Sequence, residues 1–403
     1  THGHEDHIGA IHHLILAFPE MEIFAPRFAE ILIKNKLAPR KINKKIHLYT
    51  HKDKLKFDEY TLHPIHVTHS IPDTHGFVFH SSEFSTLFIS DFKFDLNPSF
   101  ENPFDLLKIK KLLATSKKSL AMLDSTNILS AGKTLSESDL IPDLEKIISN
   151  EKRTFITLFS SNIYRVKNIL ELSKKHKKKV VTIGRSIQNY LNAAYAAKII
   201  DENTYPVVDL DSVQNHADTK IIYVITGSQG EHLGAARRII SGEQKNIQLN
   251  SSDQFVFCSK PIPGNEAKIY RLYNMLAQTG VDLITSKDMQ IHASGHPCQQ
   301  DLHSVLSEIK PNFFIPIHGE TYFLRKHIQF VKGNYPNIET ILLQNFQGVE
   351  YKNSKLKEFS LQEKLPSIIH GKDLPIERER ISERRKLAIS GAVFISLNHK
   401  SQN

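Results

Sequence analysis

Apolar and polar residues alternate in two different ways along this chain. Up to about residue 125, the helical periodicity of DHIGAIHHLILAF (6–18) is followed by short apolar runs that predict strands. The runs are MEIFAP (21–26), KIHLYT (45–50), TLHPIHVTHS (61–70), GFVFH (76–80), STLFISDF (85–92) and LAMLDST (120–126). Several of them carry His or Asp near their ends, so we expect layered sheets with a functional site on their edge loops.

Strict strand–helix alternation fills residues 136–296. Apolar runs lead into helical patterns three times: TFITLFSSN (154–162) into 164–178, KVVTIGRS (179–186) into 189–200, and KIIYVITGSQGE (220–231) into 232–242. This pattern is typical of a parallel α/β sheet. The chain then continues with a predicted helix, a strand, a second helix and closing strands, at 298–311, 312–320, 321–331 and 339–359.

Composition limits the classes of protein that fit. Lys and Arg outnumber Asp and Glu by 52 to 43 in 403 residues, which gives a net charge of +9 and favours a polyanionic partner. Cys258 and Cys298 form no CxxC pair and no disulfide framework, so we expect a reducing cytoplasm. No apolar run approaches the roughly 18 residues of a membrane span, so no membrane partner is expected.

The decapeptide THGHEDHIGA (1–10) crowds four potential metal ligands into six positions. His2 and His4 can point the same way from an extended loop, while Asp6 and His7 at the mouth of the following helix are offset toward a second position. Two adjacent sets of imidazole and carboxylate groups suit a pair of zinc or manganese ions. The spacing is too dense for an ordinary polar loop.

The same decapeptide resembles the signature of the metallo-β-lactamase fold, and the resemblance extends to about residue 397. MLDST (122–126), IHASGH (291–296) and PIHGE (316–320) are similar to the A, B and C motifs of the β-CASP nucleases. FSSNIYR, GRS, ITGSQGE and PIPGNE, in that order, narrow the resemblance to the bacterial ribonuclease J family.

This resemblance implies an α/β fold with several parts. A metallo-β-lactamase αββα sandwich would be formed by residues 1–135 and 297–365, and an α/β β-CASP domain would be inserted at 136–296. Residues 366–403 would be a linker toward a C-terminal domain.

The resemblance also implies that the protein binds two divalent metal ions. Zn²⁺ is the expected metal, with Mn²⁺ or Mg²⁺ as alternatives. One ion would be held by His2, His4, His69 and Asp91. The other would be held by Asp6, His7, Asp91 and His318, so that Asp91 bridges both. Taken singly, His69 and His318 could be hydrogen-bonded histidines at strand ends, and Asp91 could be a turn residue.

Catalytic roles follow from the same comparison. Asp6 would hold the attacking water, and His296 would stabilise or protonate the leaving oxygen. Asp124 would orient an imidazole, although a cap at a strand-to-loop turn is the alternative.

RNA contacts would come from two further regions. His292, Ser294 and Gly295 would contact phosphate, because small residues let backbone N–H groups approach an oxygen. Arg185, Ser186 and Ser228 would bind the 5′-terminal phosphate or the backbone, whereas Glu231 could be only a first-turn helix carboxylate.

The implied activity is that of a cytoplasmic ribonuclease in RNA processing and decay. It would act as a 5′–3′ exonuclease and an endonuclease on single-stranded RNA, preferably 5′-monophosphorylated, and leave 5′-phosphate and 3′-hydroxyl ends. The full-length protein would be a homodimer or homotetramer.

Three alternatives compete with this hypothesis. A DNA nuclease of the same superfamily would tend to carry an apolar residue in place of His318. A small-molecule metallo-hydrolase would not need the long insertion with its second histidine pair. A catalytically silent subunit would typically have lost ligands.

The chain departs from the family pattern at both ends. The family has strands before THGHEDH and a further C-terminal domain, and both look absent or truncated here. We therefore expect residues 1–403 alone to be poorly active or unstable, because an apolar sheet face and a strand edge would be uncovered.

Overall fold

The computed structural model describes residues 1–352, 355–362, 368–370 and 374–390. The chain divides into two compact units, Thr1–Leu342 and Leu343–Asn403. The predicted tail, 366–403, therefore lies partly outside the described residues. Within the part of the chain that is described, no helix is both long and apolar enough to cross a bilayer.

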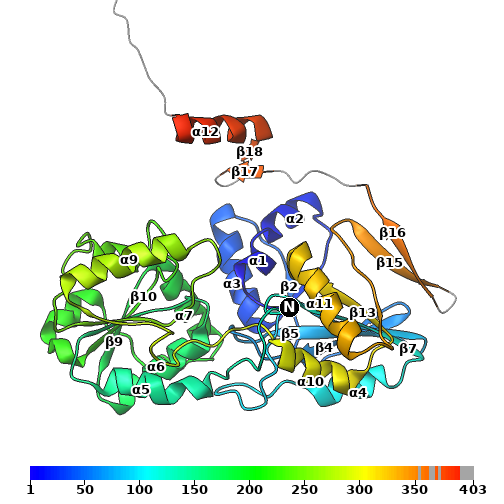
Figure 1. Ribbon diagram of the computed structural model, residues 1–403, viewed down its shortest axis with the longest axis horizontal. Coiled ribbons are helices and arrows are strands. Elements are labelled where there is room, and N and C mark those ends of the chain that lie inside the picture. The colour runs from blue at the N-terminus through cyan, green and yellow to red at the C-terminus, as the bar shows by residue number, and fades with distance from the viewer. Residues whose placement is uncertain (353–354, 363–367, 371–373, 391–403) are drawn as a thin grey trace, which may run out of the picture. The chain divides into compact units, whose positions relative to one another are not determined.

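A seven-stranded mixed sheet lies in the first unit, in the order β14-β13-β7-β6-β5-β4-β3 (Figure 1). Its strands are β3 (Leu55–Phe57), β4 (Tyr60–His66), β5 (His75–His80), β6 (Phe84–Ile89), β7 (Lys118–Asp124), β13 (Phe313–Ile317) and β14 (Glu339–Thr340). Neighbours from β3 to β6 pair antiparallel, whereas β6, β7, β13 and β14 pair parallel.

The direction of these strands brings four loops to one edge. Since β4 and β6 are both antiparallel to β5, they run in the same direction as each other. Strands β7 and β13 continue that direction through parallel pairing. The carboxyl ends of β4, β6, β7 and β13 therefore meet at one sheet edge, where the following loops can share a site.

Helices cover one face of this sheet. Their apolar sides pack on strand residues such as Val78, Leu87 and Phe314, which are fully buried. These helices are α4 (Leu106–Leu113), α10 (Gln299–Ile309) and α11 (Thr321–Asn334). Before the sheet, α1 (Glu5–Ile8), α2 (Ile11–Ala17) and α3 (Arg27–Leu37) accompany a parallel pair, β1 (Ile23–Ala25) and β2 (Ile46–Leu48).

A second sheet of five strands forms the inserted part of the first unit, in the order β12-β11-β8-β10-β9. Every pairing in it is parallel, as the strand–helix alternation predicts. The strands are β8 (Thr154–Thr157), β9 (Lys179–Ile183), β10 (Ile221–Ile225), β11 (Gln254–Phe257) and β12 (Asp282–Ile284). The expected α/β fold is thus confirmed.

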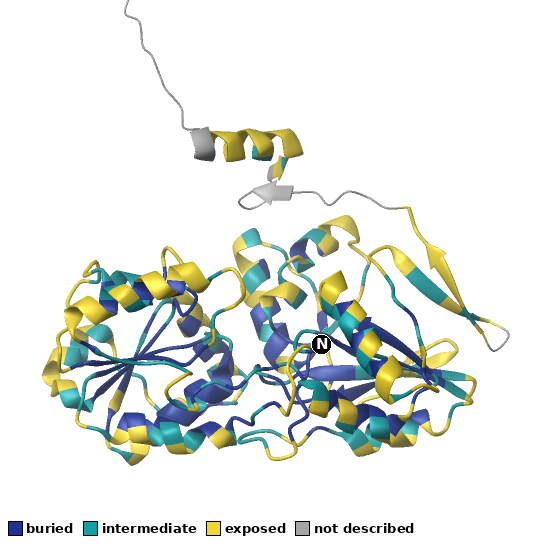
Figure 2. Cartoon of the chain, in the orientation of Figure 1, coloured by how far each residue is buried: buried dark blue, intermediate teal, exposed yellow. Residues whose placement is uncertain are grey.

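Helices cover both faces of the second sheet (Figure 1). They are α5 (Ile141–Ser149), α6 (Ile163–Lys175), α7 (Arg185–Ala196), α8 (Ala235–Ile240) and α9 (Glu266–Thr279). Side chains alternate between the faces: Ile156 packs toward α5, α6 and α7, whereas its neighbour Phe155 packs toward α8 and α9. Figure 2 shows the strands of both sheets as mostly buried.

One apolar core joins the inserted part to the N-terminal helices. The cluster that holds Leu144, Ile169 and Leu191 also contains Phe28 and Leu32 of α3. Helix α3 packs directly against α7. The inserted sheet and the N-terminal helices are therefore held together by hydrophobic contacts and not by a linker alone.

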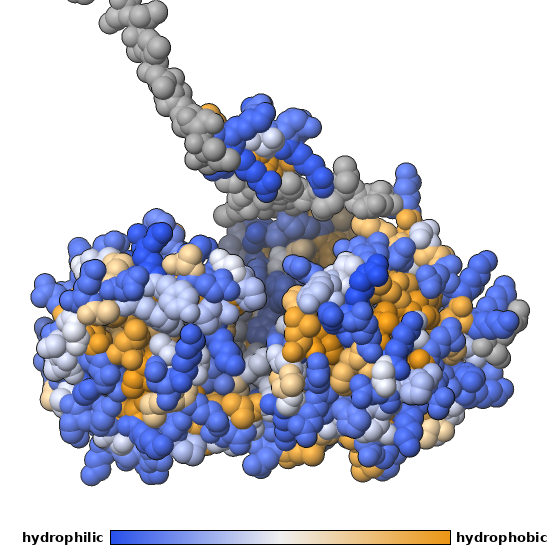
Figure 3. Space-filling model, viewed as in Figure 1, coloured by the Kyte–Doolittle hydropathy of each residue, from blue (hydrophilic) through white to orange (hydrophobic). Residues whose placement is uncertain are grey.

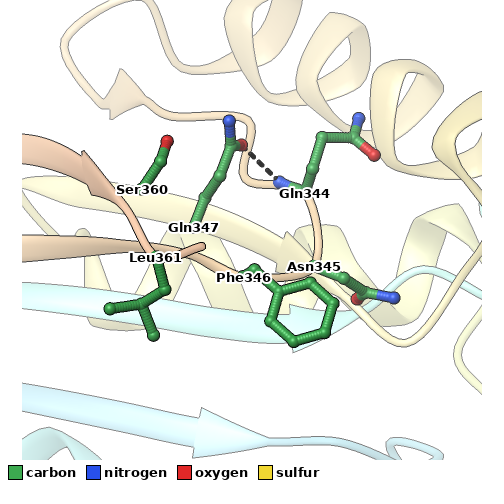
Figure 4. A pocket seen from close by; sticks show the side chains of 6 residues that line it. All are labelled: Gln344, Asn345, Phe346, Gln347, Ser360 and Leu361. Carbon is green, nitrogen blue, oxygen red and sulfur yellow. Dashed lines mark hydrogen bonds between the residues drawn. The ribbon is translucent and has the colours of Figure 1, made fainter. Parts of the chain in front are cut away.

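The second unit begins with an antiparallel hairpin of β15 (Gln347–Lys352) and β16 (Lys355–Ser360). At its base, Gln344, Asn345, Phe346 and Leu361 line a shallow pocket, where the Gln344 backbone N–H donates to Oε1 of Gln347 at 2.7 Å (Figure 4). Short strands β17 (Ile368–His370) and β18 (Leu374–Ile376) and helix α12 (Arg378–Ser390) follow.

The surface is mainly hydrophilic on the face shown in Figure 3, with apolar side chains in patches. Several large apolar side chains of the described residues are exposed, including Leu14, Leu16 and Phe18 of α2 and the turn after it. Apolar atoms are a normal part of a soluble surface, so these side chains alone indicate no partner.

We expect Phe155→Ala to destabilise the protein by about 3–5 kcal/mol, because it empties a fully buried aromatic site. The Phe155 ring stacks 4.6 Å from Tyr223 and 5.8 Å from Phe255, centroid to centroid. Urea unfolding followed by circular dichroism measures the loss. Leu107→Ala is the control, since that side chain is 62% exposed, and an equal loss in both variants would contradict the prediction.

Candidate metal centre

The opening motif forms an extended loop that runs into α1. His4 is the N-cap, with backbone angles of φ −69° and ψ 153°. Gly3 lies so close to α3 that a Cβ at this position would be 2.5 Å from Leu32 Cδ1. Only glycine fits this approach without displacing Leu32, so the loop between His2 and His4 is held against α3.

Four side chains predicted as the first ligand set lie together: His2, His4, His69 and Asp91. The ring atom His4 Nδ1 lies 3.0 Å from His2 Nε2 and 3.1 Å from His69 Nε2. The Asp91 Oδ2 atom lies 3.9 Å from the first of those Nε2 atoms and 3.7 Å from the second. Ligands about 2.0–2.1 Å from a tetrahedral zinc ion are roughly 3.3 Å apart, so this set fits a metal ion.

The second predicted set is also brought together: Asp6, His7, Asp91 and His318. His318 Nε2 lies 3.5 Å from Asp6 Oδ2 and 3.6 Å from Asp91 Oδ2. His7 Nε2 approaches Asp91 Oδ1 to 3.0 Å, yet both atoms are buried without a hydrogen bond. Two buried atoms that meet without hydrogen-bond geometry suit a shared cation better than a direct pair.

Strand ends supply three of these seven ligands. His69 follows β4, Asp91 follows β6, and His318 follows β13, all at the shared edge of the seven-stranded sheet. Asp91 is 2% exposed and belongs to both sets. A single buried carboxylate therefore lies between the two candidate metal positions.

Neighbouring groups orient the imidazoles. His69 Nδ1 donates to the Gly295 carbonyl at 2.6 Å, which leaves Nε2 for a metal. The Ser161 hydroxyl lies 3.1 Å from His4 Nε2, and the Thr126 hydroxyl lies 3.0 Å from His318 Nδ1. The orienting roles of the Ser161 hydroxyl and the Gly295 carbonyl were not predicted from the sequence. The one signal in the sequence is that Ser161 lies in the motif FSSNIYR and Gly295 in the motif IHASGH, both of which were quoted above for their resemblance to the family.

Burial and neighbouring charges divide the ligands by protonation state. Burial lowers the pKa of His2 and of His69 well below the usual range, so both rings are neutral, the form that binds metal. Burial raises the pKa of Asp91, but His7 and the other surrounding imidazoles outweigh it and hold the pKa well below its usual value. The carboxylate is therefore ionised.

On the exposed side of the centre, the carboxylates raise the pKa of the imidazoles instead of burial lowering it. Hydrogen bonds to Asp124 and Asp6 raise the pKa of His318 to about 10. Burial lowers the pKa of His7, but the nearby Asp6 and Asp91 carboxylates outweigh it and raise the pKa to about 9. This carboxylate-rich side attracts positive charge, which protons supply here and which a divalent cation can supply instead.

Asp124 and His296 form a pair beside the ligand sets. His296 Nδ1 lies 2.7 Å from Asp124 Oδ2, and His318 Nδ1 lies 3.5 Å from Asp124 Oδ1. Asp124 is fully buried at the end of β7. The structure thus places Asp124 against two imidazoles, as expected of an orienting carboxylate.

The predicted RNA contacts fall into two groups. Ser294 and Gly295 lie at the metal centre, where the Ser294 hydroxyl accepts from Asn127 Nδ2 at 2.8 Å. His292 lies in the same segment, half-buried, with Nδ1 lacking a hydrogen-bond partner.

The other predicted contacts lie at the carboxyl ends of β9 and β10. Arg185 lines a surface pocket together with Gln188, Thr226 and Arg238. The Ser186 hydroxyl lies 2.8 Å from that of Ser160. Ser228 is buried, at 2% exposure, and its backbone neighbour Gln229 donates its N–H to Glu231.

Two domain families match this chain. The family "Ribonuclease J, beta-CASP domain" matches residues 151–276. The family "Zn-dependent metallo-hydrolase RNA specificity domain" matches residues 289–340. The second match contains His292, His296 and His318.

Curated relatives are similar over most of the chain. Ribonuclease J of Synechocystis sp. is 32% identical over 98% of this chain and 62% of its own length. Ribonuclease J of Mycoplasma pneumoniae is 32% identical over 81% of this chain and 58% of its own length. Ribonuclease J of Helicobacter pylori is 29% identical over 100% of this chain and 59% of its own length. The chain thus spans about three fifths of the length of these relatives.

A solved structure agrees with the fold. The crystal structure of a protein of unknown function from Enterococcus faecalis superposes with a TM-score of 0.58 at 13% identity, and covers 85% of this chain and 76% of its own. At that identity the likeness concerns the fold alone. By its domain matches and its curated relatives, the chain is thus similar to the ribonucleases J, and its converging His and Asp side chains lie in the parts that resemble them.

Proposed function

We propose that this protein is a ribonuclease that hydrolyses RNA phosphodiester bonds with two divalent cations, Zn²⁺ first. The observation that carries the proposal is the pair of ligand sets that share Asp91 and adjoin the Asp124–His296 pair. The matched RNA specificity domain and the ribonuclease J relatives support RNA as the substrate. The products would be 5′-phosphate and 3′-hydroxyl ends.

Divalent cations held at these sets would supply Lewis acidity, which lowers the pKa of a bound water and offsets charge on a phosphate. His2, His4, His69 and Asp91 would hold one ion, and Asp6, His7, Asp91 and His318 the other. Neutral imidazoles and ionised carboxylates are the donor types that Zn²⁺ and Mn²⁺ accept.

Two side chains would transfer protons in this reaction. The Asp6 side chain is 64% exposed beside His7 and His318, so its carboxylate can accept a proton from the attacking water. His296 is held through Nδ1 by Asp124, which leaves Nε2 to give a proton to the departing 3′-oxygen. Water would therefore be deprotonated on one side of the phosphate and the leaving group protonated on the other.

The substrate would be single-stranded RNA with a 5′-monophosphate, cut both stepwise from the 5′ end and internally. Arg185 and Arg238 at one pocket, together with the net charge of +9, supply positive charge for a phosphate backbone. We further propose a cytoplasmic location and a homodimer or homotetramer for the full-length protein. A DNA nuclease or a small-molecule metallo-hydrolase remains the competing function.

We expect the protein to release mononucleotides from 5′-labelled monophosphorylated RNA and to leave matching DNA intact. Asp6→Asn and His296→Ala should each lower the rate by about 10²–10⁴-fold, since each removes a group that moves a proton. Gel analysis in Mn²⁺, Zn²⁺ or Mg²⁺ measures this. His303→Ala is the control, because His303 is exposed and bonds Tyr335 away from the site. Cleavage of DNA alone would favour the competing nuclease.

Metal content should follow the two ligand sets. We expect two equivalents of Zn²⁺ per chain by plasma mass spectrometry after dialysis. Asp91→Ala should lose most of both, because Asp91 belongs to both sets, whereas His4→Ala should lose mainly one. His303→Ala should keep the full content. Equal retention of metal by Asp91→Ala and the unsubstituted protein would contradict the assignment.

A further inference from the structure

Arg165 is a buried cation that sequence analysis did not single out. It lies in the first turn of α6, and its side chain is 1% exposed. Its guanidinium directs all five N–H groups at acceptors. The Nε and one terminal nitrogen donate to the Glu137 carboxylate at 2.8 and 2.7 Å, and the others reach the carbonyls of Cys258 (2.8 Å), Ile291 (3.0 Å) and Ala293 (3.5 Å).

Glu137 balances this charge. It is 3% exposed, and Asn162, the N-cap of α6, donates to the same carboxylate at 3.2 Å. Burial raises the pKa of Glu137, but the charge and hydrogen bonds of Arg165 outweigh it and hold the pKa at about 2. The bidentate pair is therefore ionised and neutral as a whole, which is how buried charges are tolerated.

Two of the three carbonyls that Arg165 contacts, those of Ile291 and Ala293, belong to the segment 291–296, which enters the metal centre. Two residues after Ala293, the Gly295 carbonyl accepts from His69 Nδ1. The backbone at Gly295 packs tightly against the His69 ring, since a Cβ at position 295 would lie 2.6 Å from His69 Cε1. The next residue, His296, bonds Asp124. A shift of this segment would move both a metal-ligating imidazole and the proposed proton donor.

The start of α6 touches the centre at a second point. The hydroxyl of Ser161, four residues before Arg165, lies 3.1 Å from His4 Nε2. Asn162, between them, caps the helix through the Arg165 backbone N–H at 3.1 Å. The residues 161–165 thus link the inserted sheet to two ligands of the first set, His4 directly and His69 through the segment 291–296.

A purely structural ion pair is the alternative, and the same domain contains one for comparison. Arg153 donates to Asp253 with the same bidentate geometry, at 2.8 and 2.7 Å, and to the Gln248 carbonyl. Asp253 is 1% exposed, so this pair is also buried on the carboxylate side. Among the described residues, neither Asp253 nor the Gln248 carbonyl lies in the segment 291–296 or in a ligand set.

We infer that Arg165, paired with Glu137, is a positioning residue that fixes the segment 291–296 so that Gly295 orients His69 and His296 faces the reacting phosphate. The effect on catalysis rests on the proposed function, whereas the effect on metal binding does not. Lysine cannot replace Arg165, because its ammonium group offers three donors from one point and cannot reach a carboxylate and three carbonyls together.

The test compares Arg165→Lys and Glu137→Gln with the matched controls Arg153→Lys and Asp253→Asn. We expect the first two variants to bind Co²⁺ about 10–100-fold more weakly and to change its visible absorption spectrum, because His69 loses its orienting partner. The rate of RNA cleavage should fall by a similar factor. The controls should lower the unfolding temperature but keep the Co²⁺ affinity and spectrum of the unsubstituted protein.

Each outcome decides the matter. If Arg165→Lys and Glu137→Gln resemble the controls, with Co²⁺ affinity and spectrum unchanged, the positioning role is wrong and the pair is structural. If Arg165→Lys does not fold, the isosteric Glu137→Gln decides on the same readouts. If the unsubstituted protein cleaves no RNA but the Co²⁺ differences appear, the proposed function fails while the positioning role stands.

Discussion

The attraction between the buried Asp91 carboxylate and positive charge is the interaction on which this structure depends. Five imidazoles and a second carboxylate, from Asp6, converge around it from segments far apart in the sequence. Ring nitrogens gathered this closely repel one another once protonated and leave lone pairs unused when neutral. A divalent cation bound to these side chains would remove both problems. Because it would bind only the folded chain, it would also stabilise the fold.

Strand direction explains how such distant residues meet. Strands β4 and β6 are both antiparallel to β5, so they run in the same direction. Strands β7 and β13 pair parallel to β6 and to β7, so they run in that direction too. Each loop at that edge then contributes one ligand or orienting group. The inserted sheet adds no metal ligand of its own among the described residues, but supplies contacts that hold the ligands in place, through Ser161 and the segment 291–296.

Local patterns were enough to predict much of this arrangement. The dense HxHxDH spacing predicted a cluster of His and Asp side chains, and regular strand–helix alternation predicted the parallel sheet. Strand β11 and helix α9 were also missed, since β11 offers only three consecutive apolar residues, Phe255, Val256 and Phe257, to mark a strand before that helix. The roles of Ser161 and Arg165 were not predictable for another reason. Their partners lie 157 and 28 or more residues away, so only the folded chain brings them together.

The core shared by α3 and α7 limits which segments proteins of this fold can exchange by recombination. An inserted domain that met its host only through a linker could be exchanged as a cassette. Here Leu32 of α3 both contacts Gly3 of the ligand loop and belongs to the core that contains Leu191 of α7. Recombination that replaces residues 136–296 alone would therefore mismatch side chains directly beneath the metal ligands. Viable chimaeras should inherit the N-terminal helices and the inserted sheet from the same parent.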